Sequence, residues 1–332
     1  PGPVCYSRGG IEPTVTDANV VLGYMNPRSI AGSSLKIDRE AAIDAIERKL
    51  AAPLGLSPLE AAYGVTRVAN SAMTRVLRAV STERGRDPRE FTLAAFGGAG
   101  PIHAAALAES MEMSRLIVPL HPGLFSALGL LLADYRHDYI ASIVSPLSSM
   151  REDDIRSRYA MLKETARAEM AAEGVGPSPI RFEQYLDMKY GYQMYEMTLP
   201  FPPEAETELT ERLARLFTQA HDQAYGYHRD DPIELVSLRL RALASVSSIR
   251  FADLAAKASA GGPRTETPRE SREAYFGPAY GSIVTPVCAR FDIDGPRRGP
   301  LIIEEPDTTV VAPPNWRVER DALANLILTR SD

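Results

Sequence analysis

Residues 91–104 read Phe-Thr-Leu-Ala-Ala-Phe-Gly-Gly-Ala-Gly-Pro-Ile-His-Ala. The apolar run 91–96 is typical of a short buried strand, and Pro101 suits the first turn of a helix, where no N–H is needed. A strand that ends in glycines and opens a helix brings free backbone N–H groups close to a ligand without side-chain bulk. The same pattern is also typical of a tight packing turn, and the spacing alone leaves both interpretations open.

Helices and strands alternate on both sides of this turn. Upstream, Ser57–Glu60 has the pattern of a capping box with proline at the first helical position, and the helix is expected to stop at Gly85. Downstream, the pattern predicts a helix at 101–111, a strand at 115–118 and a helix at 124–134. Alternation of this kind favours a mostly parallel sheet covered by helices.

After Tyr139 the sequence changes character and predicts an α+β domain. Its expected elements are a charged helix, a hairpin, a second helix and a long strand, at 150–173, 182–199, 204–224 and 233–246. Residues 253–272 have the composition of a linker. The last part of the chain offers short strand candidates at 282–290, 301–304, 308–311 and 325–328.

Three parts of the chain are therefore expected. The first is an α/β half-domain over 1–138, and the second is the α+β domain over 139–252. The third, 253–332, is expected to be a linker and a small β-rich segment that packs with the preceding domain.

Composition limits the classes of function. The 332 residues are 45% hydrophobic and 24% charged with a net charge of -6, which argues against a general nucleic-acid binder. No apolar run is long enough to cross a bilayer, and no signal peptide is visible. Cys5 and Cys288 are far apart, so a reducing cytoplasm is expected. Because the chain starts at Pro1 with a loop-like stretch, we expect a truncated or processed polypeptide.

Several motifs together resemble one family. Phe96–Ala104 is similar to the Phe-Gly-Gly-Ala-Gly-Pro-Leu-His-Ala signature of the hydantoinase A/5-oxoprolinase family. Residues 2–10 and 13–19 resemble its Gly-Pro-x-Cys-Tyr-Gly-Arg-Gly-Gly and Pro-Thr-Val-Thr-Asp-Ala-Asn patterns, with Ser7 in place of glycine. Further similar segments lie at 81–88, 187–190, 225–227 and 299–305, so the resemblance covers nearly the whole chain as a carboxy-terminal half.

The resemblance implies a ribonuclease H-like half-domain of the actin-like ATPase type, with ATP and Mg²⁺ as cofactors of the full-length protein. By position in the motif it assigns adenosine contacts to Gly97, Gly98, Ala99 and Gly100. The helix before the turn adds Asn70, Arg75 and Arg78 as weaker candidates. The family's Asp-x-Gly-Gly-Thr phosphate patterns do not occur in this sequence, so we expect no ATP hydrolysis by this chain alone.

The implied activity is ATP-dependent opening of a cyclic amide such as a hydantoin or 5-oxoproline. It requires an amino-terminal half that this chain lacks and a partner subunit of the hydantoinase B type, and a homo-oligomer is compatible with it. Two alternatives stay open: a β-type subunit of an acetone or acetophenone carboxylase, and an ATPase-fold assembly module without catalysis of its own.

Two further residues are candidates for catalysis. Asp17, with Asn19, is expected either to cap a helix over 18–22 or, by the family pattern, to face the cleft. His103 lies two residues into the helix after the glycines, where it is expected either to act as an acid or base or to satisfy a backbone group. Cys5 has no neighbouring histidine and is expected to be buried. The five histidines lack zinc-site spacing, so no metal ligands are assigned.

Overall fold

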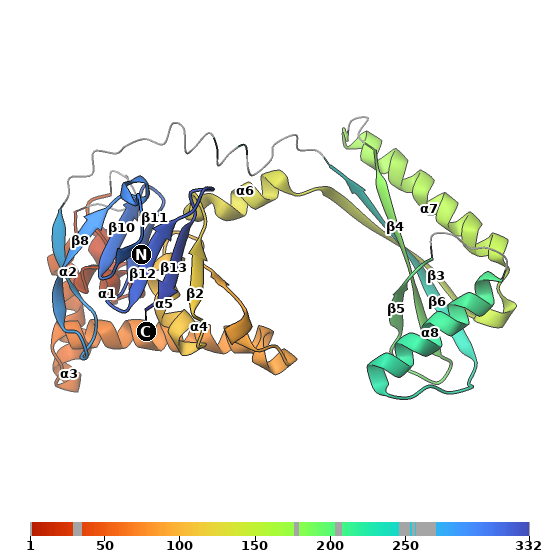
Figure 1. The fold of residues 1–332 in the computed structure, drawn as a ribbon, viewed down its shortest axis with the longest axis horizontal. Coiled ribbons are helices and arrows are strands. Elements are labelled where there is room, and N and C mark those ends of the chain that lie inside the picture. The colour runs from red at the N-terminus through yellow and green to blue at the C-terminus, as the bar shows by residue number, and fades with distance from the viewer. Residues whose placement is uncertain are drawn as a thin grey trace. The chain divides into compact units, whose positions relative to one another are not determined.

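The computed structural model describes residues 2–28, 35–175, 179–202, 208–245, 253, 256 and 270–331. The chain forms two compact units, Pro1–Leu130 with Ile249–Asp332, and Leu131–Ser248 (Figure 1). The second unit is thus an insertion in the first. The expectation that 253–332 packs with the preceding domain is wrong, because strand β13 (Leu326–Arg330) pairs with β2 (Arg115–Val118) of the first unit.

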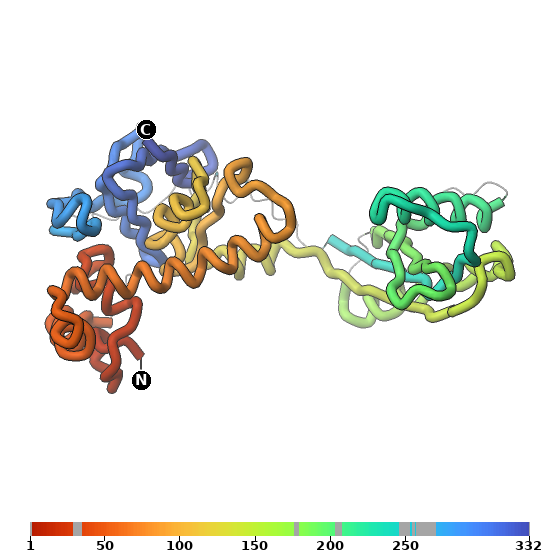
Figure 2. Tube along the Cα trace, turned by 90° about the horizontal axis from the view of Figure 1, so that it is seen from below, coloured from red at the N-terminus to blue at the C-terminus, as the bar shows by residue number. Residues whose placement is uncertain are grey.

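Most helices of the first unit come early in the chain. They are α1 (Val15–Val21), α2 (Arg39–Ile46) with a π-helical extension Glu47–Ala51, α3 (Ala52–Leu54), α4 (Pro58–Val80) and α5 (Gly100–Ser110). The predicted start of α4 is confirmed: the Ser57 N–H donates to the Glu60 carboxylate at 2.9 Å, and the Ser57 hydroxyl accepts from the Glu60 N–H. In Figure 2, α4 is the long orange helix of this unit.

Two sheets complete the first unit. One has the order β1 (Leu93–Ala94), β2, β13, β12 (Trp316–Arg320), β9 (Arg297–Arg298). The other has the order β11 (Thr308–Ala312), β10 (Leu301–Glu305), β8 (Ser282–Cys288), β7 (Ser271–Tyr275). Among the described strands only β1–β2 and β8–β10 are parallel pairs. The expectation of a mostly parallel sheet is wrong because short connections join β10 to β11 and β12 to β13, and such hairpins are antiparallel.

Helix α5 lies between elements of both sheets, since it contacts β2 of one and β11 of the other. Its apolar residues Ala104 and Ala108 join a core that includes Leu116 and the fully buried Trp316. Ile102, on another face of α5, joins a second core formed with α1, α2 and β10. The glycine turn that precedes α5 is therefore held where the two sheets meet.

The second unit is an antiparallel sheet with two helices. Its strand order is β3 (Tyr135–Pro146), β6 (Ile233–Ala244), β4 (Arg181–Tyr190), β5 (Met197–Pro200). Helices α7 (Glu152–Ala172) and α8 (Leu209–Tyr225) pack on it around a core that includes Tyr159 and Phe217. α6 (Phe125–Leu132) precedes β3 in the chain. β3 lacks the sequence pattern of a buried strand, because its residues alternate between exposed and partly exposed without a fully buried position, and it was not predicted.

The expected fold class, an α/β unit of ATPase-like fold combined with an α+β domain, is confirmed. The predicted linker 253–272 lies almost entirely outside the described residues, and its end, Ser271 and Arg272, already belongs to β7. Across the described residues, no helix is both long enough and apolar enough to cross a membrane.

Candidate functional site

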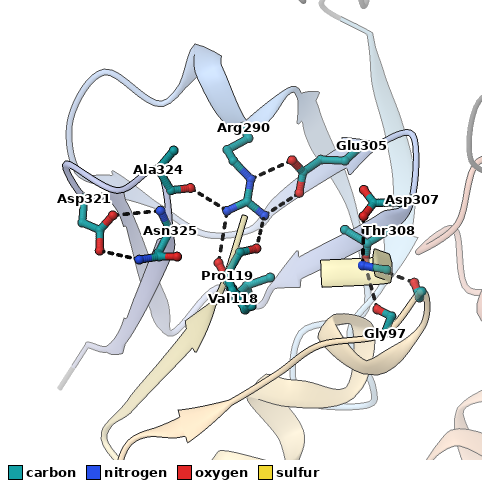
Figure 3. A network of polar contacts seen from close by, with 12 residues as sticks. Gly97, Val118, Pro119, Arg290, Glu305, Asp307, Thr308, Asp321, Ala324 and Asn325 are labelled. Carbon is teal, nitrogen blue, oxygen red and sulfur yellow. Dashed lines mark hydrogen bonds and ion pairs between the residues drawn. The ribbon is translucent and has the colours of Figure 1, made fainter. Parts of the chain in front are cut away.

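The Gly97–Gly100 turn is attached to the chain segments around it by backbone and side-chain hydrogen bonds. Gly97 has a left-handed φ of 87°, which glycine adopts without strain, and its N–H donates to the Pro122 carbonyl at 2.7 Å. The Thr308 hydroxyl donates to the carbonyls of Gly98 at 3.1 Å and Gly97 at 3.4 Å (Figure 3). The turn is thus tied to the start of β11 in the four-stranded sheet.

A pocket of about 390 Å³ opens beside this turn. Its lining comes from the turn itself, from α1 and from the β10–β11 hairpin: Tyr6, Val15, Thr16, Asn19, Met25, Asn26, Gly98, Ala99, Glu304, Glu305, Asp307, Thr308 and Thr309. The glycine turn therefore lines a pocket, as its interpretation as a ligand-binding turn requires. There is free space beside Gly98: a Cβ added to this residue would have its nearest neighbour, the Asp307 carbonyl oxygen, at 3.5 Å.

His103 lies one helical turn into α5 and is only 6% exposed. Its Nδ1 lies 2.8 Å from Asn70 Oδ1 and its Nε2 lies 3.4 Å from Asn19 Nδ2. Burial lowers the pKa of His103, so the imidazole is neutral near pH 7. A neutral ring donates through Nδ1 to the Asn70 oxygen and accepts at Nε2 from the Asn19 amide. His103 thus links α5 to both α1 and α4.

A second pocket, about 460 Å³ in volume, lies on the α4 side of His103. Arg67, Arg75 and Arg78 of α4 line it, and within the described part of the chain none of the three has a carboxylate partner. Two lining residues, Asn19 and Thr74, are more than nine-tenths buried, and their side-chain oxygens have no hydrogen-bond partner. The pocket therefore combines cationic groups with buried acceptors, which suits an anion that also carries N–H donors.

The residues that were predicted to contact the nucleotide line different pockets. Asn70, Arg75, Arg78 and His103 line the α4 pocket, and Gly98 and Ala99 line the pocket beside the turn. Gly100 faces a third, apolar groove, and Gly97 lines none of these pockets. Asn19 lines both of the first two pockets, so it connects the two groups of predicted residues.

Asp17 has a different place from the one expected. Thr14, not Asp17, is the N-cap of α1, so the expectation that Asp17 is the N-cap residue is wrong. Asp17 still helps to cap this helix, because it is the third helical residue of a capping box and its carboxylate accepts the Thr14 N–H. Its fully buried carboxylate accepts hydrogen bonds from the N–H groups of Val4, Cys5 and Thr14 and from the Thr14 hydroxyl, at 2.7–3.1 Å. Burial opposes ionisation, but these hydrogen bonds, led by that from Cys5, lower the pKa of Asp17 overall.

A carboxylate bonded in this way holds the Val4–Tyr6 turn against α1, and Asp17 is not among the residues that line the two pockets described above. Cys5 is fully buried, and burial, reinforced by Asp17, raises the pKa of its thiol, which therefore stays protonated. Both findings favour structural roles for these two residues.

The carboxylates near the turn do not fit a magnesium site. Glu304 pairs with Arg272 and accepts from Asn26, Glu305 pairs with Arg290, and Asp307 accepts from the Gly123 N–H at 2.9 Å. Within the described residues there is no cluster of three or more His, Cys, Asp or Glu side chains that could hold a metal ion. The carboxylates here are therefore committed to protein contacts.

Arg290 is the main polar residue that sequence reasoning missed. It is 1% exposed and forms a bidentate ion pair with Glu305, in which its Nε and Nη2 donate to the two carboxylate oxygens at 2.6 Å each. Its remaining N–H groups donate to the carbonyls of Val118, Pro119 and Ala324 at 2.8–3.1 Å (Figure 3). Arg290 thus joins the ends of strands from both sheets behind the glycine turn. An isolated arginine after a strand carries no local signal for this role.

The comparisons with known proteins cover the whole chain. The model described as Hydantoinase/oxoprolinase matches residues 1–139, and that of the Hydantoinase/oxoprolinase C-terminal domain matches 147–329. Caprolactamase subunit alpha of Pseudomonas jessenii is 33% identical over 336 residues, covering 99% of this chain and 48% of the relative.

Two solved structures have the same fold. The crystal structure of ATP-dependent caprolactamase from Pseudomonas jessenii has a TM-score of 0.74 at 31% identity, covering 100% of this chain and 49% of that one. The nucleotide-free acetone carboxylase structure has a TM-score of 0.79 at 23% identity, covering 99% and 48%. The chain thus spans about half the length of the relatives it matches first. These matches, together with the Gly97–Gly100 turn and its position before α5, place the chain in the hydantoinase/oxoprolinase family.

Proposed function

We propose that this chain is the carboxy-terminal part of a subunit of an ATP-dependent hydrolase that opens a cyclic amide, working with a hydantoinase B-type partner. The observation that carries the proposal is the match to caprolactamase subunit alpha, which extends over 99% of the chain at 33% identity. The family description, hydantoinase/oxoprolinase, supports the same class of substrate, a ring closed by a C–N bond of an amide.

The chain's own contribution is to one wall of the nucleotide site. The three unpaired arginines of α4 offer charge to an anionic ligand, and the buried oxygens of Asn19 and Thr74 offer acceptors for N–H groups such as those of a base. Gly98 and Ala99 provide close backbone approach in the adjoining pocket. Because the family's phosphate patterns do not occur in this sequence, the phosphate-positioning groups come from elsewhere in the longer polypeptide.

The experiment uses the longer polypeptide together with a B-type partner and measures phosphate release from ATP. We expect ATP consumption to depend on a cyclic amide, tested with a hydantoin, 5-oxoproline and caprolactam. ATP consumption that depends instead on a ketone and bicarbonate would assign the chain to a carboxylase. ATP consumption indifferent to all of these would leave only the assembly module.

A matched pair of variants tests the α4 pocket within the same assay. Arg78→Gln removes a cation that lines the pocket, whereas Arg84→Gln removes an exposed cation that lies outside it. We expect Arg78→Gln to raise the KM for ATP at least about 10-fold, since one charge-assisted hydrogen bond contributes about 1.5–3 kcal/mol. Arg84→Gln is expected to leave KM unchanged. Equal KM values for the two variants would remove the pocket from the proposal.

A further inference from the structure

Helix α4 is amphipathic, but in the described structure part of its apolar stripe faces solvent. Its polar face lines the α4 pocket, the one of about 460 Å³ described above, and Asn70 and Thr74 are among the lining residues. A separate stripe at four-residue spacing, Val68, Ala72, Val76 and Val80, is exposed; the valines are 72%, 65% and 49% exposed in order. Apolar stripes of this kind on a soluble protein mark a surface that packs against another element.

The stripe borders an apolar groove of about 330 Å³ between α4, β1 and α5. Met73, Val76 and Leu77 line it from α4, and Leu93, Phe96 and Leu107 line it from the strand and the next helix. Phe96 is 47% exposed although it lies directly before the glycine turn. One element placed in the groove would cover both the helix stripe and the side of β1.

Strand β1 is an edge strand of the five-stranded sheet, but its apolar sequence is typical of a central strand. Among the described strands it pairs with β2 alone, and it pairs in parallel, which is the arrangement of strands that are normally covered on both sides. The run 91–96, Phe-Thr-Leu-Ala-Ala-Phe, has no lysine or proline, and the short length of β1, two residues, is the one feature that protects this edge. A free edge beside an apolar groove is suited to pairing with one more strand.

We propose that a strand of the same polypeptide, from the part that precedes these 332 residues, pairs with the free edge of β1 and packs on the Val68–Val80 stripe. The chain's match covers about half of its relatives, so they contain further chain of similar length. The family model that matches 147–329 is described as a C-terminal domain, and this favours a covering strand from the part that precedes it in those relatives. The groove and stripe then become an internal junction of one folded polypeptide.

Backbone hydrogen exchange gives a residue-level test. The Ala95 N–H already donates to the Ile117 carbonyl at 2.9 Å. Because N–H groups alternate sides along a strand, those of Ala94 and Phe96 point to the free edge. We expect exchange at Ala94 and Phe96 to be at least about 100-fold slower in the longer polypeptide than in the 332-residue chain. Ala95, protected in both, is the internal control.

A matched pair of variants tests the helix stripe. Val76→Glu places a charge in the proposed junction, and Val284→Glu on β8 is its control at a similar exposure, 69% against 65%. We expect Val76→Glu to abolish the added protection of Ala94 and Phe96 in the longer polypeptide, and Val284→Glu to preserve it. In the 332-residue chain neither variant is expected to shift the thermal midpoint by more than about 1 °C, because each valine is exposed there.

Equal exchange at Ala94 and Phe96 in the two polypeptides would overturn the proposal. So would protection in the 332-residue chain that is lost on dilution, because a second copy would then cover the edge. Preserved protection in the Val76→Glu variant would refute the role of the stripe. None of these measurements needs nucleotide, substrate or partner, so their outcome is separate from that of the proposed hydrolase activity.

Discussion

Replacing Arg290 by methionine is expected to destabilise the first unit strongly. The substitution removes a fully buried guanidinium and leaves the Glu305 carboxylate, whose side chain is 11% exposed, without its partner. The carbonyls of Val118, Pro119 and Ala324 also lose their donor. Removing one partner of a buried ion pair costs about 3–5 kcal/mol, because the other charge stays buried and uncompensated. With a urea m-value of about 3 kcal/mol/M, the unfolding midpoint falls by about 1–1.7 M.

The single tryptophan makes the assay specific to this unit. Trp316 is fully buried in β12, in the core formed by both sheets, and the inserted unit has no tryptophan. Urea unfolding followed by tryptophan fluorescence therefore reports the free energy of unfolding of the unit that contains Arg290. Far-ultraviolet circular dichroism, which also detects the helices of the inserted unit, shows whether the loss is confined to the first unit.

Two further variants test the reasoning. Arg28→Met breaks a pair with Glu270 at 3.5 Å, in which the side chains are 78% and 55% exposed, and is expected to lower the midpoint by less than about 0.3 M, since exposed pairs contribute under about 1 kcal/mol. Adding Glu305→Met to Arg290→Met is expected to recover part of the loss, because no unpaired charge then remains. A midpoint for Arg290→Met no lower than that for Arg28→Met, or a double variant no more stable than the single, would refute the argument.

Three other predictions follow from the site. Because the hydrogen bonds to Asp17 lower its folded-state pKa, its contribution to stability is full above about pH 4 and is lost as the pH falls through that lowered pKa. Urea titrations from pH 7 to pH 3 should therefore show the advantage of wild type over Asp17→Asn shrinking only below about pH 4; a constant difference would contradict this. Gly97→Ala is expected to lose about 1–2 kcal/mol because of its positive φ, whereas Gly98→Ala, with room for a Cβ, should keep wild-type stability; equal urea midpoints would disprove the assignment. Calorimetry on the 332-residue chain should detect no ATP binding at micromolar concentrations, and micromolar affinity would mean that the phosphate groups are not needed from elsewhere.

Local interactions explain which parts of the fold were predictable. The capping box at Ser57–Glu60 and the strand Arg115–Val118 were predicted with correct bounds because each depends on residues close together in sequence. The Gly97–Gly100 turn was recognised for the same reason, and the structure places its Gly98 and Ala99 against a pocket. The role of these residues as adenosine contacts stays a prediction.

The sequence by itself determined the family, the strand–turn–helix around Gly97 and the existence of two structural classes in one chain. Only the tertiary structure decided that the last strands return to the first unit, and that Arg290 bonds to Val118, 172 residues away, across the junction of the sheets. It also decided which backbone groups Asp17 binds, among them the Cys5 N–H. The physical reason is that periodicity and capping report contacts within a few residues. Strand pairing and the burial of a charge depend on which distant segments supply the partners.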